Sequence, residues 1–493
     1  MPAAGVDYPG GGAVAGLARR AGIIALARFA NQALVIVSPI ILVRLLSVAE
    51  FGHYREFLLY VGVLTSIAAF GINSSLLYFV PTHRDSAWRY VRQAVTLTAL
   101  NSTAGAAILV ALNSLLDGAL VGDLAIQVAL YVVLFTNVDF WEFLWLAKRR
   151  PGAWFAYTSG RLVARMTVVI LAAALSGDVD TIIWSLIALE ATRLAISVVG
   201  WRRRVSGSEE STPESWREQL RYCTPVGAAM ILVTLNRSLG GLFITKLMGP
   251  VALAHYAIGT YVQPVIGILR NSLSDVLLPE MAARHVVAER DPLALWRRTT
   301  IVAAILLLPA GLVLATFAEP LVVTVFSEQY RASVPVFQLY LLVLIRECFD
   351  FGVPLRLLNR TAPIMHSNLL AMLLNAALLI AFLPTLGLVG AVGAFVISRF
   401  VEGLYLGWRT MRLYDIGVRE LASWGDLARV LAALVPAAAV LLVPQWTAVL
   451  GLFGLPLAAS AFLVTFVAAL LVLRLPEAVR AARRVRGPVG AET

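Results

Sequence analysis

Eight arginines lie inside long apolar stretches of this chain, where an uncompensated charge is costly. They are Arg28, Arg161, Arg165, Arg193, Arg237, Arg270, Arg346 and Arg399. A charged side chain at the centre of a spanning helix costs about 2.5–3.5 kcal/mol on insertion scales, so each requires a partner or a hydrated cavity. Guanidinium groups also form bidentate, charge-assisted hydrogen bonds with phosphate. These residues therefore point either to internal ion pairs or to the binding of an anion.

Three of these arginines have a carboxylate three or four residues away in the sequence. Residues at that spacing share one face of a helix and can pair. We therefore predict three structural ion pairs. The pairs are Glu190 with Arg193, Arg399 with Glu402, and Arg346 with Asp350.

A fourth group of charges joins two neighbouring apolar stretches. Arg161 and Arg165 share a face of one stretch, and Asp139 and Glu142 share a face of the preceding one. An interhelical charge cluster is the simplest interpretation. The alternative is a relay for H⁺ or Na⁺, because buried carboxylates change protonation when their surroundings change. Asp139, Glu142 and Asp275 are the candidates for such ion coupling.

The remaining arginines are the candidates for binding a ligand. Neither Arg28 nor Arg237 has a carboxylate three or four positions away, and Arg270 lies in the stretch that follows Arg237. Polar side chains nearby could add hydrogen bonds to the ligand; they are Asn31, Asn236 and Gln263. The alternative for the arginines is an interhelical salt bridge or snorkelling to headgroups, and single polar residues often merely join helices.

Fourteen apolar stretches must position these side chains. Hydrophobic residues make up 59% of the 493 residues and charged residues only 14%, and a spanning helix needs about 20 apolar residues. We predict an all-α polytopic membrane protein, because lipid leaves backbone groups dependent on partners within the segment. The expected spans are 21–43, 54–80, 93–116, 122–147, 153–175, 181–200, 221–246, 251–280, 299–318, 333–355, 362–383, 387–408, 428–445 and 448–473.

The net charge of +11 is segregated into alternate loops. Arginine-rich segments such as 148–150, 202–204 and 480–486 would share one side of the membrane. The positive-inside rule then places both termini in the cytoplasm. The basic excess therefore indicates membrane topology and gives no reason to expect a nucleic-acid partner.

The motifs of catalysis are missing from the sequence. There is no phosphate-binding G-x-x-x-x-G-K-[ST] motif, and the five histidines show no H-E-x-x-H spacing. Cys223 and Cys348 lie in apolar stretches, where they are expected to be small hydrophobic residues. We therefore expect a carrier without covalent chemistry, and without a metal or an organic cofactor.

An internal repeat indicates how the spans are grouped. Residues 45–54 (LLSVAEFGHY) align without gaps with residues 247–256 (LMGPVALAHY), each just after the first span of a set of six. Two parallel six-helix lobes are the expected arrangement. The predicted divisions are a first lobe over 1–200, a cytoplasmic linker over 201–220, a second lobe over 221–408, and a final helix pair with a basic tail over 409–493.

Five segments carry a resemblance to a known family. They are LVRLLSVAEFGHY (42–54), FGINSSLLYFVP (70–81), LMGPVALAHYAIGTYVQPV (247–265), VFSEQYRASVPVFQLYLL (325–342) and LGLVGAVGAFVISRF (386–400). Over roughly residues 17–475 the chain resembles the polysaccharide-transporter branch of the multidrug/oligosaccharidyl-lipid/polysaccharide (MOP) exporter superfamily. That branch includes Wzx-type flippases and the lipid II flippase.

The resemblance implies a function. Such proteins are two-lobe carriers of the bacterial inner membrane that move undecaprenyl-pyrophosphate-linked oligosaccharides from the cytoplasmic to the outer leaflet by alternating access. The candidate arginines would then hold the pyrophosphate, and the membrane potential or an ion gradient would drive transport. A monomer is expected, with a polysaccharide polymerase or glycosyltransferases as further partners. The alternatives are a lipid II flippase, a cation-coupled multidrug exporter of the same superfamily and, from another class, a membrane polysaccharide polymerase.

Overall fold

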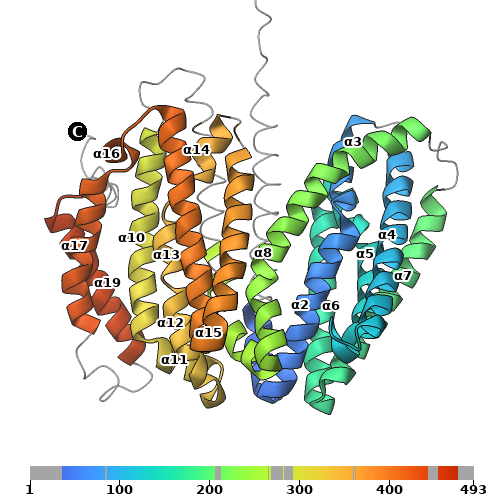
Figure 1. Cartoon of the computed structure of the whole chain (residues 1–493), viewed down its shortest axis with the longest axis horizontal. Coiled ribbons are helices and arrows are strands. Elements are labelled where there is room, and N and C mark those ends of the chain that lie inside the picture. The colour runs from blue at the N-terminus through green and yellow to red at the C-terminus, as the bar shows by residue number, and fades with distance from the viewer. Residues whose placement is uncertain are drawn as a thin grey trace, which may run out of the picture. The chain divides into compact units, whose positions relative to one another are not determined.

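The described part of the chain is built from helices joined by turns. The computed structural model describes residues 36–83, 86–205, 212–264, 266–267, 281, 293–358, 360, 362–441 and 454–475, and no strand occurs among them (Figure 1). Eight of its helices are long and apolar enough to cross a membrane, or nine if one bent pair counts as a span. The predicted class, an all-α polytopic membrane protein, is confirmed.

The chain packs as two compact units, Met1–Ala254 and His255–Thr493. The first contains a helix over Ile36–Leu45, α2 (Val48–Ala69), α3 (Ile72–Thr82), α4 (Ala87–Leu115), η1 (Gly122–Leu124), α5 (Ala125–Ala147), α6 (Pro151–Ser176), α7 (Val179–Val205) and most of α8 (Pro213–Gly259). Helices α5 and α6 follow the predicted spans 122–147 and 153–175 to within a few residues, whereas α2, α4 and α8 begin six to eight residues before the predicted spans. Many exposed positions on these helices carry large apolar side chains, such as Leu175, which is 86% exposed, as a lipid-facing surface requires.

The predicted span 54–80 is a bent pair of helices. Phe70 and Gly71 both have positive φ angles, 39° and 68°, and α2 and α3 diverge by 41° at this point. Helix α8 crosses the bend closely: a Cβ on Gly227 would lie 2.5 Å from the carbonyl oxygen of Phe70. Glycine is therefore required at the crossing so that the two backbones can approach.

Helix α8 approaches α2 and α3 closely at several points within the first unit. At its far end, a Cβ on Gly52 would lie 2.2 Å from the carbonyl oxygen of Pro250, just after α8 breaks at Gly249 (φ 83°). Packing thus assigns most of α8 to the first unit. The lobe boundary at 201–220 rests on the internal repeat, which is a different criterion from packing, and it stays a prediction.

The second unit contains long helices and a segment that is broken into short ones. Its elements are α10 (Ala294–Thr316), α11 (Ala318–Val325), η2 (Glu328–Ser333), α12 (Val334–Tyr340), α13 (Val343–Glu347), α14 (Gly352–Leu357), α15 (Ala362–Tyr414), α16 (Val418–Leu421), α17 (Trp424–Leu441) and α19 (Gly454–Val472). The 53 residues of α15 would extend about 80 Å as one helix, far beyond a bilayer. A break at Gly387 (φ 58°) divides it into two lengths that match the predicted spans 362–383 and 387–408.

The predicted span 333–355 is three short helices, α12 to α14. The breaks are closed by short-range hydrogen bonds, including one from the amide of Leu344 to the carbonyl oxygen of Leu341 at 3.0 Å. At the second break, Arg346 donates to the carbonyl oxygen of Phe349 at 3.2 Å. Asp350 accepts from the amide of Gly352 at 3.0 Å. Polar side chains thus satisfy backbone groups that the interrupted helix leaves open.

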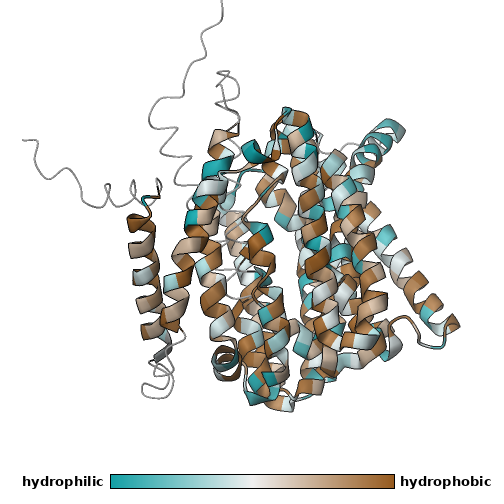
Figure 2. Cartoon of the chain, turned by 60° about the vertical axis from the view of Figure 1, so that its left-hand side comes forward, coloured by the Kyte–Doolittle hydropathy of each residue, from teal (hydrophilic) through white to brown (hydrophobic). Residues whose placement is uncertain are grey.

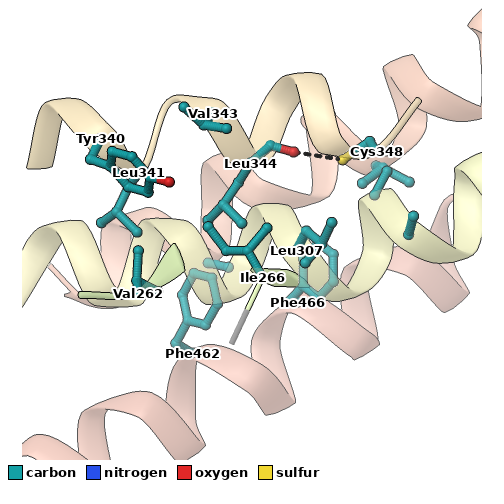
Figure 3. Close-up of a cluster of buried hydrophobic side chains, with 14 of the residues drawn as sticks. Val262, Ile266, Leu307, Tyr340, Leu341, Val343, Leu344, Cys348, Phe462 and Phe466 are labelled. Atoms are coloured by element: carbon teal, nitrogen blue, oxygen red, sulfur yellow. Dashed lines mark hydrogen bonds between the residues drawn. The ribbon is translucent and has the colours of Figure 1, made fainter. Parts of the chain in front are cut away.

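An apolar cluster fixes this broken segment within the second unit. Figure 3 shows Tyr340 and Leu344 of the broken segment packed with Leu307 of α10 and Phe462 of α19. Cys348 joins the cluster and donates to the carbonyl oxygen of Leu344 at 3.2 Å. Both cysteines are free and buried.

Basic and aromatic side chains meet at one end of each unit. In the first unit, the Lys148 ammonium lies 4.3 Å from the centre of the Trp88 ring. In the second, the Arg412 guanidinium lies 4.7 Å from the centre of the Trp408 ring. Figure 2 shows hydrophilic residues gathered toward helix ends and hydrophobic residues along the helix shafts. This is the distribution expected at a membrane interface.

Candidate functional site

The charges of α5 and α6 meet within the first unit. Arg161 of α6 lies 2.6 Å from an oxygen of Asp139 and 2.9 Å from an oxygen of Glu142, both on α5. All three side chains are about a quarter exposed or less. One guanidinium thus bridges two carboxylates that the sequence placed on one helical face.

A second pair lies beside it, on α7. Arg193 contacts Glu190, whose side chain is 1% exposed. The same guanidinium donates to the hydroxyl of Tyr157 on α6 at 2.8 Å, and Tyr157 donates to the carbonyl oxygen of Val138 on α5 at 2.9 Å. Hydrogen bonds through Tyr157 therefore link the charges of α7 to helices α5 and α6.

Arg165 completes the network of the first unit. Its guanidinium carbon lies 5.8 Å from the centre of the Tyr131 ring, and its electrostatic neighbours include Tyr54 and Glu190. Its Nε atom is buried without a hydrogen-bond partner. With Arg161 and Arg193 it balances Asp139, Glu142 and Glu190, so this network, which we call the first-unit charge network, sums to zero.

Four charges form a similar network in the second unit, the second-unit quartet. Arg399 of α15 contacts Glu402 and lies 2.6 Å from Glu347 of α13. Arg346 of α13 lies 3.4 Å from Glu402. None of the four side chains is more than 16% exposed, and the quartet also sums to zero. It joins the broken segment to the long helix α15.

The quartet differs from the pairing that sequence spacing predicts. Helix α13 ends at Glu347, so the helical geometry that would place Asp350 one turn beyond Arg346 is not maintained. Instead Arg346 reaches Glu402, and a carboxylate oxygen of Asp350 lies 3.7 Å from Arg356. Glu347 was missed, although an acidic residue inside an apolar stretch was a signal that could have identified it.

The predicted ligand-binding residues fall partly on described helices. Arg237 and Asn236 lie in α8, where Arg237 is exposed and Asn236 is half-buried, while Gln263 is exposed in the second unit. Arg237 has no ion-pair partner among the residues that the structure describes. Arg28, Asn31, Arg270 and Asp275 lie outside the described residues. That the set binds one ligand stays a prediction.

Sequence reasoning also missed a hydrogen-bonded seam at the start of α8. Gln219 of α8 donates to the hydroxyl of Ser75 on α3 at 2.9 Å. Gln93 of α4 donates to Ser215 of α8 at 2.5 Å. Both glutamines are completely buried. Gln93 opens a predicted apolar span, which was the available signal, whereas nothing in the charged segment 201–220 indicated that Gln219 would be buried. These bonds hold α8 to α3 and α4.

Within the described ranges, no group of three or more His, Cys, Asp and Glu side chains could hold a metal ion. The charged side chains are instead arranged as arginine–carboxylate networks. The chemistry that the described site offers is electrostatic: buried neutral networks, and an exposed guanidinium on a spanning helix.

Comparison with known proteins finds one matching family and several solved structures of similar fold. The sequence model of a family described as polysaccharide biosynthesis protein matches residues 41–335, more than half of the chain. No curated protein sequence matches. The structure of the lipid II flippase MurJ in an inward closed conformation is similar, with a TM-score of 0.71 and 13% identity over 91% of this chain and 99% of that one.

Two MATE transporters share the same fold. An inward-facing MATE family transporter of the MOP superfamily gives a TM-score of 0.55 at 12% identity, covering 78% of this chain and 96% of that one. The MATE transporter VcmN of Vibrio cholerae gives 0.52 at 14% identity, covering 81% and 96%. At such identities these likenesses show the fold. The chain belongs to the polysaccharide biosynthesis protein family and has the fold of the MOP superfamily.

Proposed function

We propose that this protein is a flippase that moves undecaprenyl-pyrophosphate-linked oligosaccharides from the cytoplasmic to the outer leaflet by alternating access. Its product would feed the synthesis of a cell-surface or secreted polysaccharide. The family supports the polysaccharide context, and the fold, shared with a lipid II flippase and with multidrug transporters, supports transport. Arginine-rich loops and both termini would face the cytoplasm.

The observation that carries the proposal is the contrast between Arg237 and five others of the eight arginines singled out in the sequence, Arg161, Arg165, Arg193, Arg346 and Arg399. Those arginines belong to the first-unit charge network or the second-unit quartet, where carboxylates balance them. Arg237 is exposed on α8 and has no carboxylate partner in the described part of the chain. An unpaired guanidinium in a spanning helix is expected to face water or an anion. A pyrophosphate supplies that anion in bidentate geometry.

Energy for transport would come from the membrane potential or from an ion gradient. Moving one charge through 100 mV is worth about 2.3 kcal/mol, so a doubly anionic head group leaving a negative interior gains about twice that amount. Coupling to H⁺ or Na⁺ through Asp139 and Glu142 is a further proposal. It requires Arg161 to release at least one carboxylate, because it now lies within 3 Å of both.

A lipid II flippase is the second candidate. The MurJ structure matches more of this chain than the MATE structures do, 91% against 78% and 81%. Both candidates use a polyprenyl pyrophosphate, so they share the proposed anion site and differ in the sugar. A multidrug exporter of amphipathic cations would gain nothing from an exposed arginine.

The test follows the substrate between leaflets. In cells that lack the protein, the lipid-linked oligosaccharide should accumulate in the cytoplasmic leaflet, and the wild-type chain should relieve that accumulation. Arg237→Gln should fail and Arg237→Lys should restore transport in part, because lysine keeps the charge without the bidentate geometry. Arg419→Gln, at an exposed position of α16, is the matched control.

The possible outcomes distinguish an error in the proposed anion site from an error in the proposed flippase function. An unchanged leaflet distribution in the deletion strain would refute the flippase for this substrate. Full rescue by Arg237→Gln at wild-type abundance would retain the flippase and remove Arg237 from the anion site. Accumulation of lipid II alone would favour the second candidate.

A further inference from the structure

Two tyrosines form a flat, exposed surface near the basic end of the first unit. Tyr78 of α3 and Tyr222 of α8 stack with ring centroids 5.3 Å apart and an interplanar angle of 14°. Tyr78 is 48% exposed and Tyr222 is partly exposed. We call this pair the tyrosine shelf.

The tyrosine shelf has a rigid support. Behind it, Phe79 stacks on Tyr90 with centroids 4.5 Å apart and meets Tyr222 edge-on at 5.6 Å. Tyr90 in turn donates to Glu218 at 2.8 Å. The α8 seam described above fixes the backbone on both sides. Such support holds the rings in one arrangement before any ligand arrives, which reduces the entropy lost on binding.

The helical face that carries Tyr78 is polar. Ser74, Tyr78 and Thr82 occur at every fourth position of α3, so their hydroxyl groups follow one face. Ser74 donates to the carbonyl oxygen of Gly71 at 2.6 Å, and Thr82 donates to that of Tyr78 at 2.7 Å. Their oxygens can still accept hydrogen bonds. Hydroxyl groups gain no hydrogen bonds from lipid chains, but they can form them with water or with a polar ligand.

We propose that the tyrosine shelf binds a sugar ring of the transported oligosaccharide. One face of a pyranose presents C–H groups that pack on an aromatic face, while its hydroxyls require hydrogen-bonding partners at the edge. The tyrosine shelf supplies the first contact and the row of hydroxyls supplies the second. This inference rests on the proposed function and assigns the sugar a binding site separate from that of the pyrophosphate.

The position of the tyrosine shelf fits this division. Tyr222 and Arg237 are fifteen residues apart on α8, which corresponds to about 22 Å along a helix. A head group anchored by its phosphates at Arg237 would therefore reach the tyrosine shelf only with its distal sugars. Bare undecaprenyl pyrophosphate would bind at Arg237 without touching the tyrosines.

The competing explanation is that Tyr78 belongs to the aromatic belt that many membrane proteins place at the lipid interface. A belt residue would contribute to stability and to general lipid contact, whatever the lipid carries. The two explanations differ in one measurable respect, which is whether loss of the ring distinguishes a glycosylated from a bare lipid.

Binding to the full-length protein in nanodiscs tests this difference. The probes are undecaprenyl pyrophosphate and the lipid-linked oligosaccharide extracted from the deletion strain. Tyr78→Ala and Tyr222→Ala should each weaken binding of the glycosylated lipid about tenfold and leave binding of the bare lipid unchanged. Tyr78→Phe keeps the ring and should retain most of the affinity. Leu77→Ala, at a 40% exposed neighbouring position, is the matched control.

Folding is checked through Cys223, which is completely buried in α8 next to the seam. A thiol reagent should react with it no faster in the variants than in the wild type. If the alanine variants lose affinity for both lipids equally, or for neither, the tyrosine shelf is not a sugar site. If the wild-type protein binds neither lipid, the flippase proposal itself fails. If the wild-type protein binds both lipids and the alanine variants bind both with unchanged affinity, the flippase proposal stands and the tyrosine shelf is not part of its binding site.

Discussion

Replacing Glu402 by glutamine tests the charge balance of the second-unit quartet. Glu402 contacts Arg399 and lies 3.4 Å from Arg346, and its side chain is 6% exposed. The substitution leaves two buried guanidiniums with Glu347 as the one remaining carboxylate of the quartet. Removing one partner of a buried pair costs about 3–5 kcal/mol, because the other charge stays buried without compensation. We expect the free energy of unfolding of the second unit to fall by that amount.

The chain contains its own reporter for this measurement. Cys348 is 4% exposed and follows Glu347 directly, so a fluorescent thiol reagent reacts with it only when the second unit opens. In a Cys223→Ala background, Glu402→Gln should lower the melting temperature by roughly 10 °C. Glu328→Gln is the control, because the Glu328 pair with Arg331 is more than half exposed on both sides and should contribute at most about 1 kcal/mol.

A second substitution identifies the cause of the loss. Arg399→Gln added to Glu402→Gln returns the quartet to zero net charge, so the double variant should be more stable than the single variant. If Glu402→Gln melts with the control, or if the double variant melts lower still, the reasoning from charge balance is refuted.

Three further predictions concern the first unit. Gly227→Ala should destabilise it by about 1–3 kcal/mol because the new Cβ would lie 2.5 Å from a carbonyl oxygen, whereas Gly160→Ala, with nothing within 4 Å, should not; thermal unfolding distinguishes them. Arg161→Gln leaves two carboxylates of α5 without their shared guanidinium and should lower the free energy of unfolding by about 3–5 kcal/mol, measured by the same melting assay. Hydrogen bonds from Thr181 lower the pKa of Asp178 at the start of α7, so this cap is complete above the ordinary aspartate pKa and is lost as the pH falls through the lowered value. Substitution can remove the same cap. Hydrogen exchange at the Thr181 amide should accelerate in Asp178→Ala, which has no acceptor, and remain slow in Asp178→Asn, which keeps one.

Much of the fold could be predicted because lipid imposes a simple rule on the sequence. The predicted span 122–147 includes all of α5, and 153–175 lies within two residues of the ends of α6, since hydropathy changes sharply at both ends of these helices. The bend at Phe70 and the breaks within 333–355 were not predicted. Averaged hydropathy does not change where a helix is interrupted, and these interruptions depend on contacts with other helices.

The charged networks show the same division between local and tertiary information. Spacing along one helix predicted the contact of Glu190 with Arg193, because three residues separate them. It could not predict that Arg399 also reaches Glu347, 52 positions earlier in the chain. Nor could it show that Arg237 is exposed on α8, because exposure depends on which helices pack beside it.

The bridge between α5 and α6 constrains how the protein is made. Helix α5 leaves the ribosome first, carrying Asp139 and Glu142, and Arg161 follows on α6, which begins after a turn of three residues. Two carboxylates released into lipid alone would cost about 5–7 kcal/mol. We therefore expect the insertion machinery to retain α5 until α6 arrives, so that the two helices enter the bilayer together as a hairpin with its charges already joined.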